Sequence, residues 1–278
     1  MKKIFSCILV VVMLAALLAV GVSAAERNYP AFENYGEIAQ VERKSVRLDG
    51  VKDEVYDAAT PIAIATQHGS AASNVTGTAY VIYDSQYIWI FVEVNDTTLK
   101  TKASDALSAS FKEDSVEILV DWTNEGKNDK NATPYQCRLS YEGYISARLG
   151  QTGDNMYGSV EDGGTAPVTW LNGTSKVRAD KTGYDCEFRI ALPEGVEVNE
   201  RIGINFMIND WEDQDTNRAM ITSASNGAAE WEVGNIGYMT FNGVPYTADT
   251  TFIYVVIALV AALAIGGVTL VSLKKKAK

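Results

Sequence analysis

A carboxylate and a guanidinium occupy corresponding positions on two segments with strand-like alternation. In 114–121 the apolar residues alternate with Glu117, and in 136–141 they alternate with Arg138. Because successive side chains of a strand point to opposite faces, both charged groups are expected on the outer face of one sheet. Carboxylates and guanidinium groups both hydrogen-bond neutral hydroxyls, which is what a sugar presents. The alternative is a surface salt bridge between the strands, which contributes little stability and binds nothing.

Two aromatic residues lie in polar stretches that have no strand periodicity. Trp231 lies in the Gly-containing segment 226–235, and Phe111 lies just ahead of the strand at 114–121. An aromatic ring held out on a loop can stack on the apolar face of a pyranose ring while polar neighbours bind its hydroxyls. The alternative for each ring is that it folds back and caps the core, which the position of Phe111 favours.

Runs with period-2 alternation predict the elements that must position these side chains. The expected strands are 80–83, 87–94, 116–121, 136–141, 144–149, 175–179, 184–192, 201–209 and 237–241. Turn residues such as Gly, Asn and Asp separate the strands, and the segment 41–246 has no convincing amphipathic helical pattern. We therefore expect an all-β fold, an antiparallel β-sandwich of the jelly-roll kind.

The two ends of the chain differ in composition from the middle. Residues 1–25 begin with two lysines, continue through an apolar stretch and end in small residues, the pattern of a cleaved secretory signal peptide. An uncleaved N-terminal anchor is the alternative. Residues 252–273 carry no charge and precede the basic segment 274–278, so we expect a transmembrane helix of about 33 Å. Lysines after the span predict a single-pass cell-membrane protein with an extracellular domain and a cytoplasmic C-terminus.

The middle of the chain is predicted to contain one domain. Residues 26–40 are expected to be a lead-in, 41–246 the β-sandwich and 247–251 a linker. All 35 acidic residues lie between the two basic ends, the formal net charge is −11, and one His is present. Nucleic acid is therefore excluded as a partner, because phosphate neutralisation requires clustered Lys and Arg. An acidic surface also favours a neutral glycan over an anionic polymer.

Few side chains indicate reactive chemistry. Cys137 and Cys186 remain after removal of the signal peptide, and they form either one disulfide or two buried thiols, because both lie on the apolar side of their strands. His68 has no evident partner motif for a Ser-His-Asp arrangement. A glycoside hydrolase with paired carboxylates stays an alternative, since 35 acidic residues make chance pairs easy to find.

Several motifs together resemble the family 9 carbohydrate-binding modules that occur on xylanases and other secreted proteins. They are Leu48–Glu54, Tyr87–Asp96, Asp114–Asp121, Gln136–Leu139, Ile208–Asp210, and Trp231 with Asn235–Gly237. The resemblance implies a non-catalytic β-sandwich that holds a terminal sugar between two aromatic side chains. Carried over by motif, Trp231 and Phe111 are the aromatic walls, and Glu117, Arg138 and Asp210 are polar contacts.

Three positions depart from the family's pattern. Phe111 replaces a Trp, and Met207 stands where a Gln would help binding. Ala228 stands where an Asn is expected, a role that Asn226 takes over if the loop is shaped differently. The resemblance implies binding of a neutral plant-type glycan such as xylan at the surface of a bacterial cell. A structural or adhesive domain whose sugar site has decayed is the alternative.

Members of the family are also associated with structural calcium, although sugar binding itself requires no cofactor. The loop Asp121–Asp129 offers hard oxygen donors, but Lys127 interrupts them and the spacing differs from that of a twelve-residue calcium loop. The Asn, Asp and Gly content of this loop favours the alternative of a solvated acidic turn.

Overall fold

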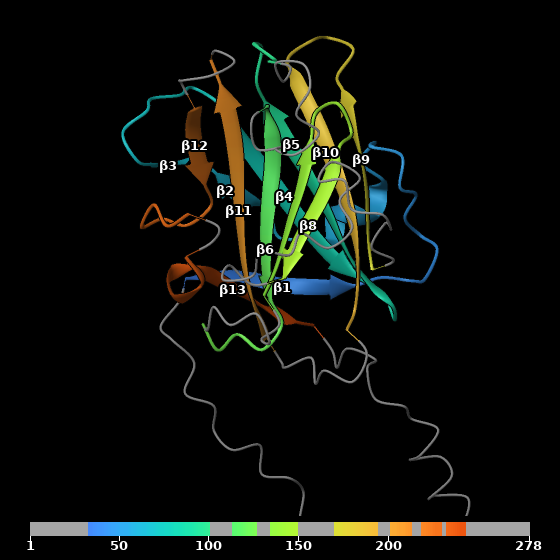
Figure 1. Ribbon diagram of the computed structural model, residues 1–278. Coiled ribbons are helices and arrows are strands. Elements are labelled where there is room, and N and C mark those ends of the chain that lie inside the picture. Colours follow the sequence, from blue (N-terminus) through green and yellow to red (C-terminus); the bar gives the residue numbers. More distant parts are fainter. Residues whose placement is uncertain are drawn as a thin grey trace, which may run out of the picture. The chain divides into compact units, whose positions relative to one another are not determined.

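The computed structural model describes residues 33–100, 113–126, 134–149, 170–193, 201–212, 218–229 and 232–242. Its strands are β1 (Asn34–Gln40), β2 (Ile62–Ile64), β3 (Thr66–His68), β4 (Thr76–Tyr83), β5 (Tyr87–Asn95), β6 (Ser115–Asp121), β7 (Pro134–Ser140), β8 (Ile145–Leu149), β9 (Leu171–Val177), β10 (Gly183–Ala191), β11 (Arg201–Trp211), β12 (Arg218–Thr222) and β13 (Gly237–Phe241). Short 3-10 turns form at η1 (Glu54–Ala58) and η4 (Val233–Asn235). Nothing in these ranges is α-helical, which confirms the all-β prediction (Figure 1).

The described ranges contain no helix long and apolar enough to cross a membrane. The expected signal peptide at 1–25 and the expected span at 252–273 both lie outside these ranges.

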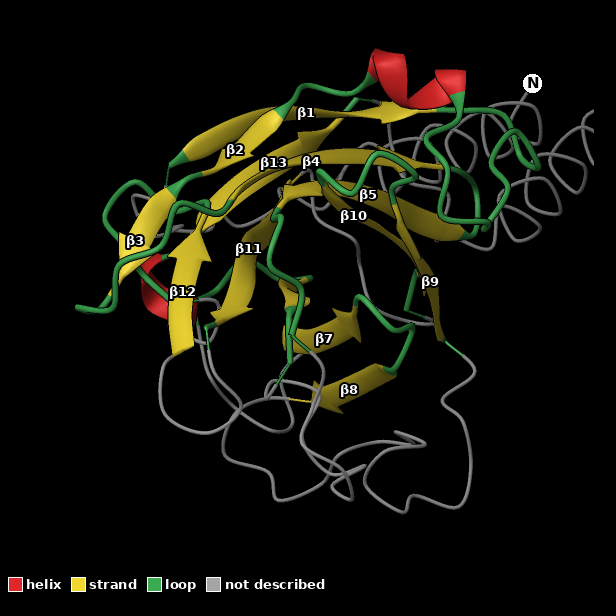
Figure 2. Cartoon of the chain, turned by 90° about the horizontal axis from the view of Figure 1, so that it is seen from above, coloured by secondary structure: helices red, strands yellow, loops and turns green. Residues whose placement is uncertain are grey.

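Hydrogen-bonded pairing connects the strands into one continuous path. The order is β8-β7-β6-β11-β13-β1-β4-β5-β10-β9, with β12 paired to β11, β3 paired to β12, and β2 paired to β4. β1 runs parallel to both β13 and β4, so it joins a first sheet around β6 and β11 to a second sheet around β5 and β10. Seen from above, β7 and β8 lie across the interior from β5 and β10 (Figure 2). The fold is a β-sandwich, as the alternation predicts.

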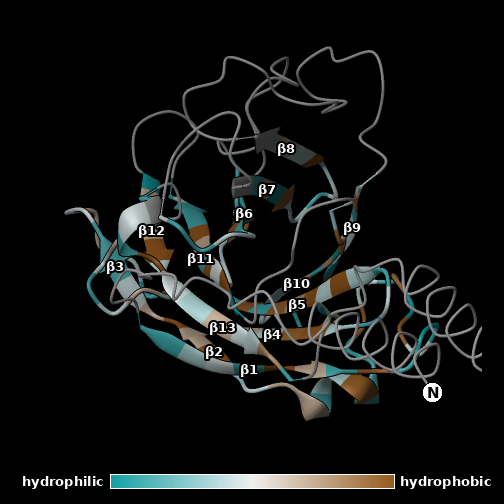
Figure 3. Cartoon of the chain, turned by 90° about the horizontal axis from the view of Figure 1, so that it is seen from below, coloured by the Kyte–Doolittle hydropathy of each residue, from teal (hydrophilic) through white to brown (hydrophobic). Residues whose placement is uncertain are grey.

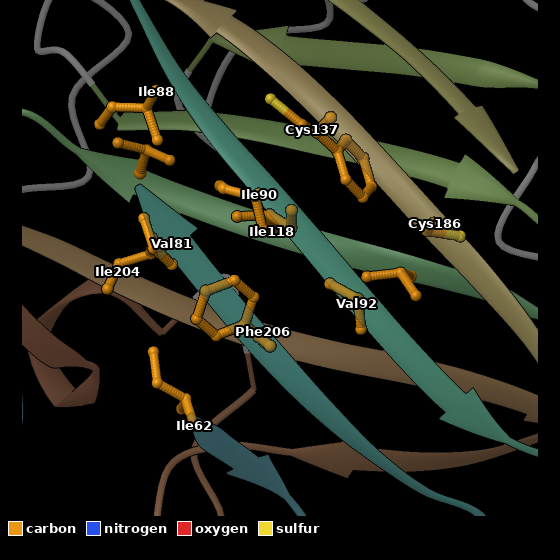
Figure 4. Packing of buried hydrophobic residues seen from close by; sticks show 14 of the residues in the cluster. Ile62, Val81, Ile88, Ile90, Val92, Ile118, Cys137, Cys186, Ile204 and Phe206 are labelled. Atoms are coloured by element: carbon orange, nitrogen blue, oxygen red, sulfur yellow. The ribbon is translucent and has the colours of Figure 1, made fainter. Parts of the chain in front are cut away.

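The interior is filled by the apolar residues of the alternating strands. Val81 and Ile90 of the second sheet belong to the same buried cluster as Ile118 and Phe206 of the first sheet (Figure 4). Figure 3 shows hydrophobic stretches along β4 and β5, whereas β3 at the periphery is more hydrophilic. Glu117 precedes Ile118 on β6 and therefore points away from this core.

The two cysteines of the domain are free thiols. Cys137 of β7 and Cys186 of β10 are both fully buried and are not bonded to each other (Figure 4). The Cys186 thiol lies 3.7 Å from the backbone oxygen of Leu139. Burial raises the pKa of both thiols. Of the two alternatives, the structure therefore supports buried thiols that pack as small apolar side chains.

The segment expected as a lead-in contains a strand. In β1 the buried residues Tyr35 and Ile38 are three positions apart, because the register shifts where Gly36 adopts a φ of 105°. This bulge removes the period-2 signal by which a strand is recognised. The sequence pattern also does not predict the short strands β2, β3 and β12, and it places β9 at 175–179 rather than at Leu171–Val177.

The outer face of the second sheet is covered by the segment that precedes β2. Tyr56 of η1 packs against Phe91 with ring centroids 5.5 Å apart, and Trp89 belongs to the same small cluster. Trp89 is therefore a packing residue, as its alternation with Tyr87 and Phe91 predicts.

Glu187 of β10 is buried beneath this covering segment. Its Oε2 accepts hydrogen bonds from the backbone N–H groups of Asp49 and Gly50, each at 3.0 Å, and its Oε1 accepts from the Tyr56 hydroxyl at 3.1 Å. Burial raises the pKa of Glu187 to about 7, although these donors oppose the shift. The carboxyl group joins the covering segment to β10 through these three hydrogen bonds.

Candidate functional site

Glu117 and Arg138 meet on the outer face of the first sheet. Glu117 of β6 lies opposite Arg138 of β7 and opposite Met207 of β11 in the strand register. Arg138 Nε donates to Glu117 Oε1 at 2.8 Å. The Glu117 side chain is 1% exposed and the Arg138 side chain 11%. The structure brings the two groups together as the alternation predicts, and the pair is buried rather than lying on a solvated surface.

Three more side chains complete a row of hydrogen bonds across the sheet. Gln136 Nε2 donates to Glu117 Oε2 at 3.0 Å, and Asn209 Nδ2 donates to Glu117 Oε1 at 2.7 Å. Arg218 Nε donates to Asn209 Oδ1 at 2.7 Å. We call the five side chains of Gln136, Arg138, Glu117, Asn209 and Arg218 the Glu117 chain. They come from β7, β6, β11 and β12, which are consecutive neighbours in the sheet.

The Glu117 chain is held in one geometry by its own hydrogen bonds. Burying a carboxylate and a guanidinium removes them from water, and their mutual attraction offsets that cost only when further hydrogen bonds satisfy the remaining atoms. Gln136 and Asn209 provide those bonds to Glu117. The arrangement therefore presents a preformed set of amide and guanidinium groups, which suits the recognition of hydroxyl groups.

Asn209 and Arg218 belong to the Glu117 chain, but the sequence pattern did not identify them as site residues. Asn209 reaches Glu117 through the β6–β11 register, in which Asn209 pairs with Ser115. Its alternation with Ile208 is a signal that could have found it, since this places Asn209 on the outer face. Arg218 begins β12, a five-residue strand that the alternation does not predict.

The loop after β12 closes the other end of this face. The backbone oxygen of Ala228 accepts a hydrogen bond from Thr222 Oγ1 at 2.7 Å. Asn226 is exposed, and its Oδ1 accepts from the Ala228 N–H at 2.9 Å while its Nδ2 donates to the Asn235 backbone oxygen at 3.1 Å. The Asn226 side chain is therefore engaged in shaping its own loop. Phe111 and Trp231 lie outside the described residues, so the two aromatic walls stay predictions.

The single histidine is not arranged as in a catalytic triad. His68 Nδ1 lies 2.8 Å from the backbone oxygen of Gly227. In a Ser-His-Asp triad this nitrogen is bonded to a carboxylate. A backbone partner at Nδ1 therefore favours a structural role for His68.

The candidate calcium loop Asp121–Asp129, for which the sequence favours an acidic turn, is a hydrogen-bonded turn over the part that the structure describes. Asp121 Oδ1 accepts from the Thr123 hydroxyl at 3.1 Å, and its Oδ2 accepts from the Gly126 N–H at 3.0 Å. Both carboxylate oxygens are thus used by the turn, and Asp121 is buried. Residues 127–129 lie outside the described residues.

Asp210 does not join the Glu117 chain. It follows Asn209 on β11 and therefore points to the opposite face, where its carboxylate lies with those of Asp96 and Asp114. Oxygen atoms of these three carboxylates all lie within 4.8 Å of one another, and all three residues are buried. We call Asp96, Asp114 and Asp210 the carboxylate cluster. Its members come from the end of β5, the start of β6 and the end of β11.

Part of the carboxylate cluster has no hydrogen-bond donor within the described residues. Asp114 Oδ1 accepts from the Trp211 N–H at 2.8 Å, and Asp96 Oδ1 accepts from the Thr98 N–H at 2.8 Å. Asp96 Oδ2 and Asp210 Oδ1 are buried without a partner. Burial and the neighbouring carboxylates raise the pKa of Asp114 to about 8, although its hydrogen bonds oppose this shift.

A buried tyrosine feels the charge of this cluster. Tyr184 of β10 is fully buried, and its hydroxyl has no hydrogen-bond partner within the described residues. Burial raises the pKa of Tyr184, and so do the charges of all three members of the carboxylate cluster. Buried carboxylate oxygens without donors are the ligands that a hard divalent cation such as Ca²⁺ takes, so Asp96, Asp114 and Asp210 fit the calcium that the resemblance implies.

The comparisons with known proteins identify the family to which this β-sandwich belongs. Residues 48–239 match the model of the family described as carbohydrate family 9 binding domain-like. The match covers more than half of the chain, and the chain therefore belongs to this family.

Known proteins similar to this chain agree with that assignment. The exoglucanase XynX of Acetivibrio thermocellus is 22% identical over 200 residues, which cover 71% of this chain and 16% of the relative's length. Two solved structures of a family 9 carbohydrate-binding module from Caldicellulosiruptor kristjanssonii are also similar. The complex with cellotriose has a TM-score of 0.57 at 19% identity and covers 77% of this chain and 96% of the module. The complex with glucose has a TM-score of 0.56 at 18% identity and covers 78% and 100%.

The comparisons match this chain to a binding domain and not to the rest of the exoglucanase. The exoglucanase is matched over a small part of its length, and the solved modules share the fold. The family to which the chain belongs is a family of carbohydrate-binding domains.

Proposed function

We propose that this protein binds a terminal sugar unit of a neutral plant-type oligo- or polysaccharide at the Glu117 chain, without catalysing a reaction. The observation that carries this proposal is the buried Glu117–Arg138 ion pair, held by Asn209 and Gln136 across neighbouring strands. Replacing a buried pair with apolar residues often leaves a fold equally stable, so stability alone does not account for this arrangement. Two similar structures are complexes with cellotriose and with glucose, which supports the same ligand class here.

Trp231 and Phe111 complete the proposed site as aromatic walls on either side of the sugar ring. Their positions in the family's motif support this role, and a smaller Phe in place of a Trp lowers the stacking area on one side. A decayed site in a structural or adhesive domain is the competing function, favoured by the same departure. The two functions differ in whether removal of the Trp231 ring changes sugar binding.

The absence of catalysis is supported by the bonding of Glu117. Its two oxygens accept hydrogen bonds from Arg138, Asn209 and Gln136. Both oxygens are therefore occupied by donors from the protein itself, whereas a glycoside hydrolase needs carboxyl groups that reach the glycosidic oxygen and the sugar carbon or a water.

The proposal has two further parts, a bound cation and a membrane location. A structural Ca²⁺ ion is assigned to the carboxylate cluster, on the strength of its buried oxygens without donors. The uncharged segment 252–273 and the basic tail support display of the domain outside a cell membrane, with the C-terminus in the cytoplasm.

Calorimetry of the full-length protein with cello- and xylo-oligosaccharides tests the function. Binding to at least one series is expected, and Trp231→Ala should weaken it at least tenfold, or about 1.4 kcal/mol. Tyr144→Ala is the matched control, because Tyr144 is 41% exposed in the turn between β7 and β8 and its backbone hydrogen bonds there are to Ser140, which is not a member of the Glu117 chain. Unchanged binding in the Trp231 variant would contradict the role of Trp231 as an aromatic wall of the sugar site. Release of reducing sugar by the protein would contradict a non-catalytic role.

A further inference from the structure

The carboxylate cluster and the Glu117 chain share two strands. Asp114 immediately precedes Ser115 at the start of β6, and Asn209 immediately precedes Asp210 near the end of β11. Ser115 and Asn209 are paired in the β6–β11 register. Because neighbouring side chains of a strand point to opposite faces, Asp114 and Asp210 lie on the face of the carboxylate cluster, while Ser115 and Asn209 lie on the face of the Glu117 chain.

Hydrogen bonds tie the two sites together at this point of the sheet. Asn209 Nδ2 donates both to Ser115 Oγ at 3.0 Å and to Glu117 Oε1 at 2.7 Å. On the other face, Asp114 Oδ1 accepts from the Trp211 N–H at 2.8 Å, which joins the start of β6 to the end of β11. The separation of these two strand ends therefore sets the position of Asn209 relative to Glu117.

The carboxylate cluster lacks the positive partner that buried carboxylates require. The described residues form no ion pair with Asp96, Asp114 or Asp210, although these residues are 4%, 0% and 1% exposed. Like charges at this separation repel one another, and burial strengthens the repulsion. The unpartnered Asp96 Oδ2, Asp210 Oδ1 and Tyr184 hydroxyl are the second indication that a ligand with positive charge belongs here.

We propose that binding of a divalent cation to the carboxylate cluster is coupled to binding of a sugar at the Glu117 chain, so that each ligand strengthens the other. The cation draws the ends of β5, β6 and β11 together, and this fixes Asn209 in the position from which it donates to Glu117. Without the cation, repulsion separates these strand ends and the Glu117 chain is less well formed. The coupling rests on the proposed sugar-binding function, and reciprocity requires that the sugar raise cation affinity by the same factor.

Calorimetry and thermal unfolding of the full-length protein test the coupling, with Ca²⁺ and cellotriose as the probes. The chelator-treated protein is compared with and without Ca²⁺. We expect Ca²⁺ to raise the melting temperature and to raise the affinity for cellotriose at least fivefold, which is the lower end of typical couplings. Cellotriose should raise the affinity for Ca²⁺ by that same factor. Equal cellotriose affinities with and without bound Ca²⁺ would overturn the coupling.

Asp210→Asn separates the cation site from the sugar site. The variant should lose Ca²⁺ binding and the Ca²⁺-dependent gain in cellotriose affinity. In the absence of Ca²⁺ it should melt at a higher temperature than the unsubstituted protein, because one of three crowded, buried carboxyl groups becomes a neutral amide. Asp57→Asn is the control, since Asp57 is an exposed carboxylate paired with Lys52 at 3.6 Å and should change none of these quantities. A lower Ca²⁺-free cellotriose affinity in Asp210→Asn would place Asp210 among the sugar contacts and overturn the assignment.

Arg138→Gln distinguishes failure of the coupling from failure of the sugar site. It should abolish cellotriose binding and leave the Ca²⁺-induced rise in melting temperature in place. If the unsubstituted protein binds Ca²⁺ but no neutral oligosaccharide, the proposed function fails and the coupling fails with it, while the cation site stands. If it binds cellotriose but no Ca²⁺, the cation site and the coupling fail and the sugar site stands.

Discussion

Replacing Glu117 with Gln tests whether the buried row of polar groups is the central feature of this domain. The substitution keeps the shape of the side chain but removes the charge opposite Arg138. It also replaces one acceptor oxygen with an amide nitrogen, so that one of the donors from Gln136, Arg138 and Asn209 loses its acceptor. Both effects act against the folded protein and against the preformed site.

The magnitude follows from the burial of the pair. Removing one partner of a buried ion pair costs about 3–5 kcal/mol. The Arg138 side chain is 11% exposed and retains some contact with water, which places the loss near the lower end, at about 3 kcal/mol. For a domain of this size, roughly 2–4 °C of melting temperature corresponds to 1 kcal/mol, so a fall of about 6–12 °C is expected.

Thermal unfolding and cellotriose titration of the same full-length preparation provide the assay. Affinity should fall more than tenfold in Glu117→Gln, because the amide no longer orients Arg138 and Asn209. Asp57→Asn, in an exposed pair with Lys52, should cost less than about 1 kcal/mol. The double variant with Arg138→Gln should lose less than the sum of the single losses, since the second substitution removes the unpaired charge. If Glu117→Gln melts within 2 °C of Asp57→Asn, a drop that small (about 1 kcal/mol or less) would falsify the reasoning.

Three further outcomes follow from the packing and the titrating groups. Glu187 has a native pKa of about 7, above its ordinary value of 4.5, so its contribution to stability is present below pH 4.5 and is lost as pH rises through 7. That loss is about 3 kcal/mol. The free energy of unfolding, measured with denaturant from pH 5 to 8, should therefore fall less steeply with pH in Glu187→Gln than in the unsubstituted protein. Equal slopes in the two proteins would contradict the raised pKa of Glu187. A Cβ at Gly237 would lie 2.3 Å from the Tyr35 ring, so Gly237→Ala should cost about 1–3 kcal/mol in denaturant unfolding, whereas Gly234→Ala, with its nearest neighbour at 4.0 Å, should be close to neutral. The two core thiols should resist alkylation in the folded protein and react after unfolding, as measured by mass spectrometry of each peptide; rapid labelling under native conditions would show that this part of the core opens.

Local alternation was sufficient to predict most of the strands and the orientation of the first two site residues. β5, β6, β11 and β13 lie close to where the period-2 runs place them. Glu117 and Arg138 share a face because each alternates with apolar neighbours, a property of each strand by itself. The motifs that resemble family 9 modules lie on these same strands, and the family match confirms the resemblance.

Long-range pairing accounts for what the alternation missed. β1 pairs in parallel with strands from both sheets, and its bulge at Gly36 removes the local signal. The motif resemblance places Asp210 among the sugar contacts. In the strand register, however, Asn209 shares the face of Glu117, and Asp210 lies on the opposite face of β11. A shift of one residue exchanges the two faces of a strand, so register decides which of two adjacent polar residues belongs to which site.

The amino-acid sequence by itself determined the class of fold, the family and one charged pair, because these depend on the alternation and order of residues along single strands. Only the tertiary structure decided that Asn209 and Arg218 extend that pair, that the cysteines are free, and that Asp96, Asp114 and Asp210 meet. Those three carboxylates come from the ends of three strands that are far apart in the chain. Their proximity arises from hydrogen-bond pairing across the sheets, which leaves no period in the sequence.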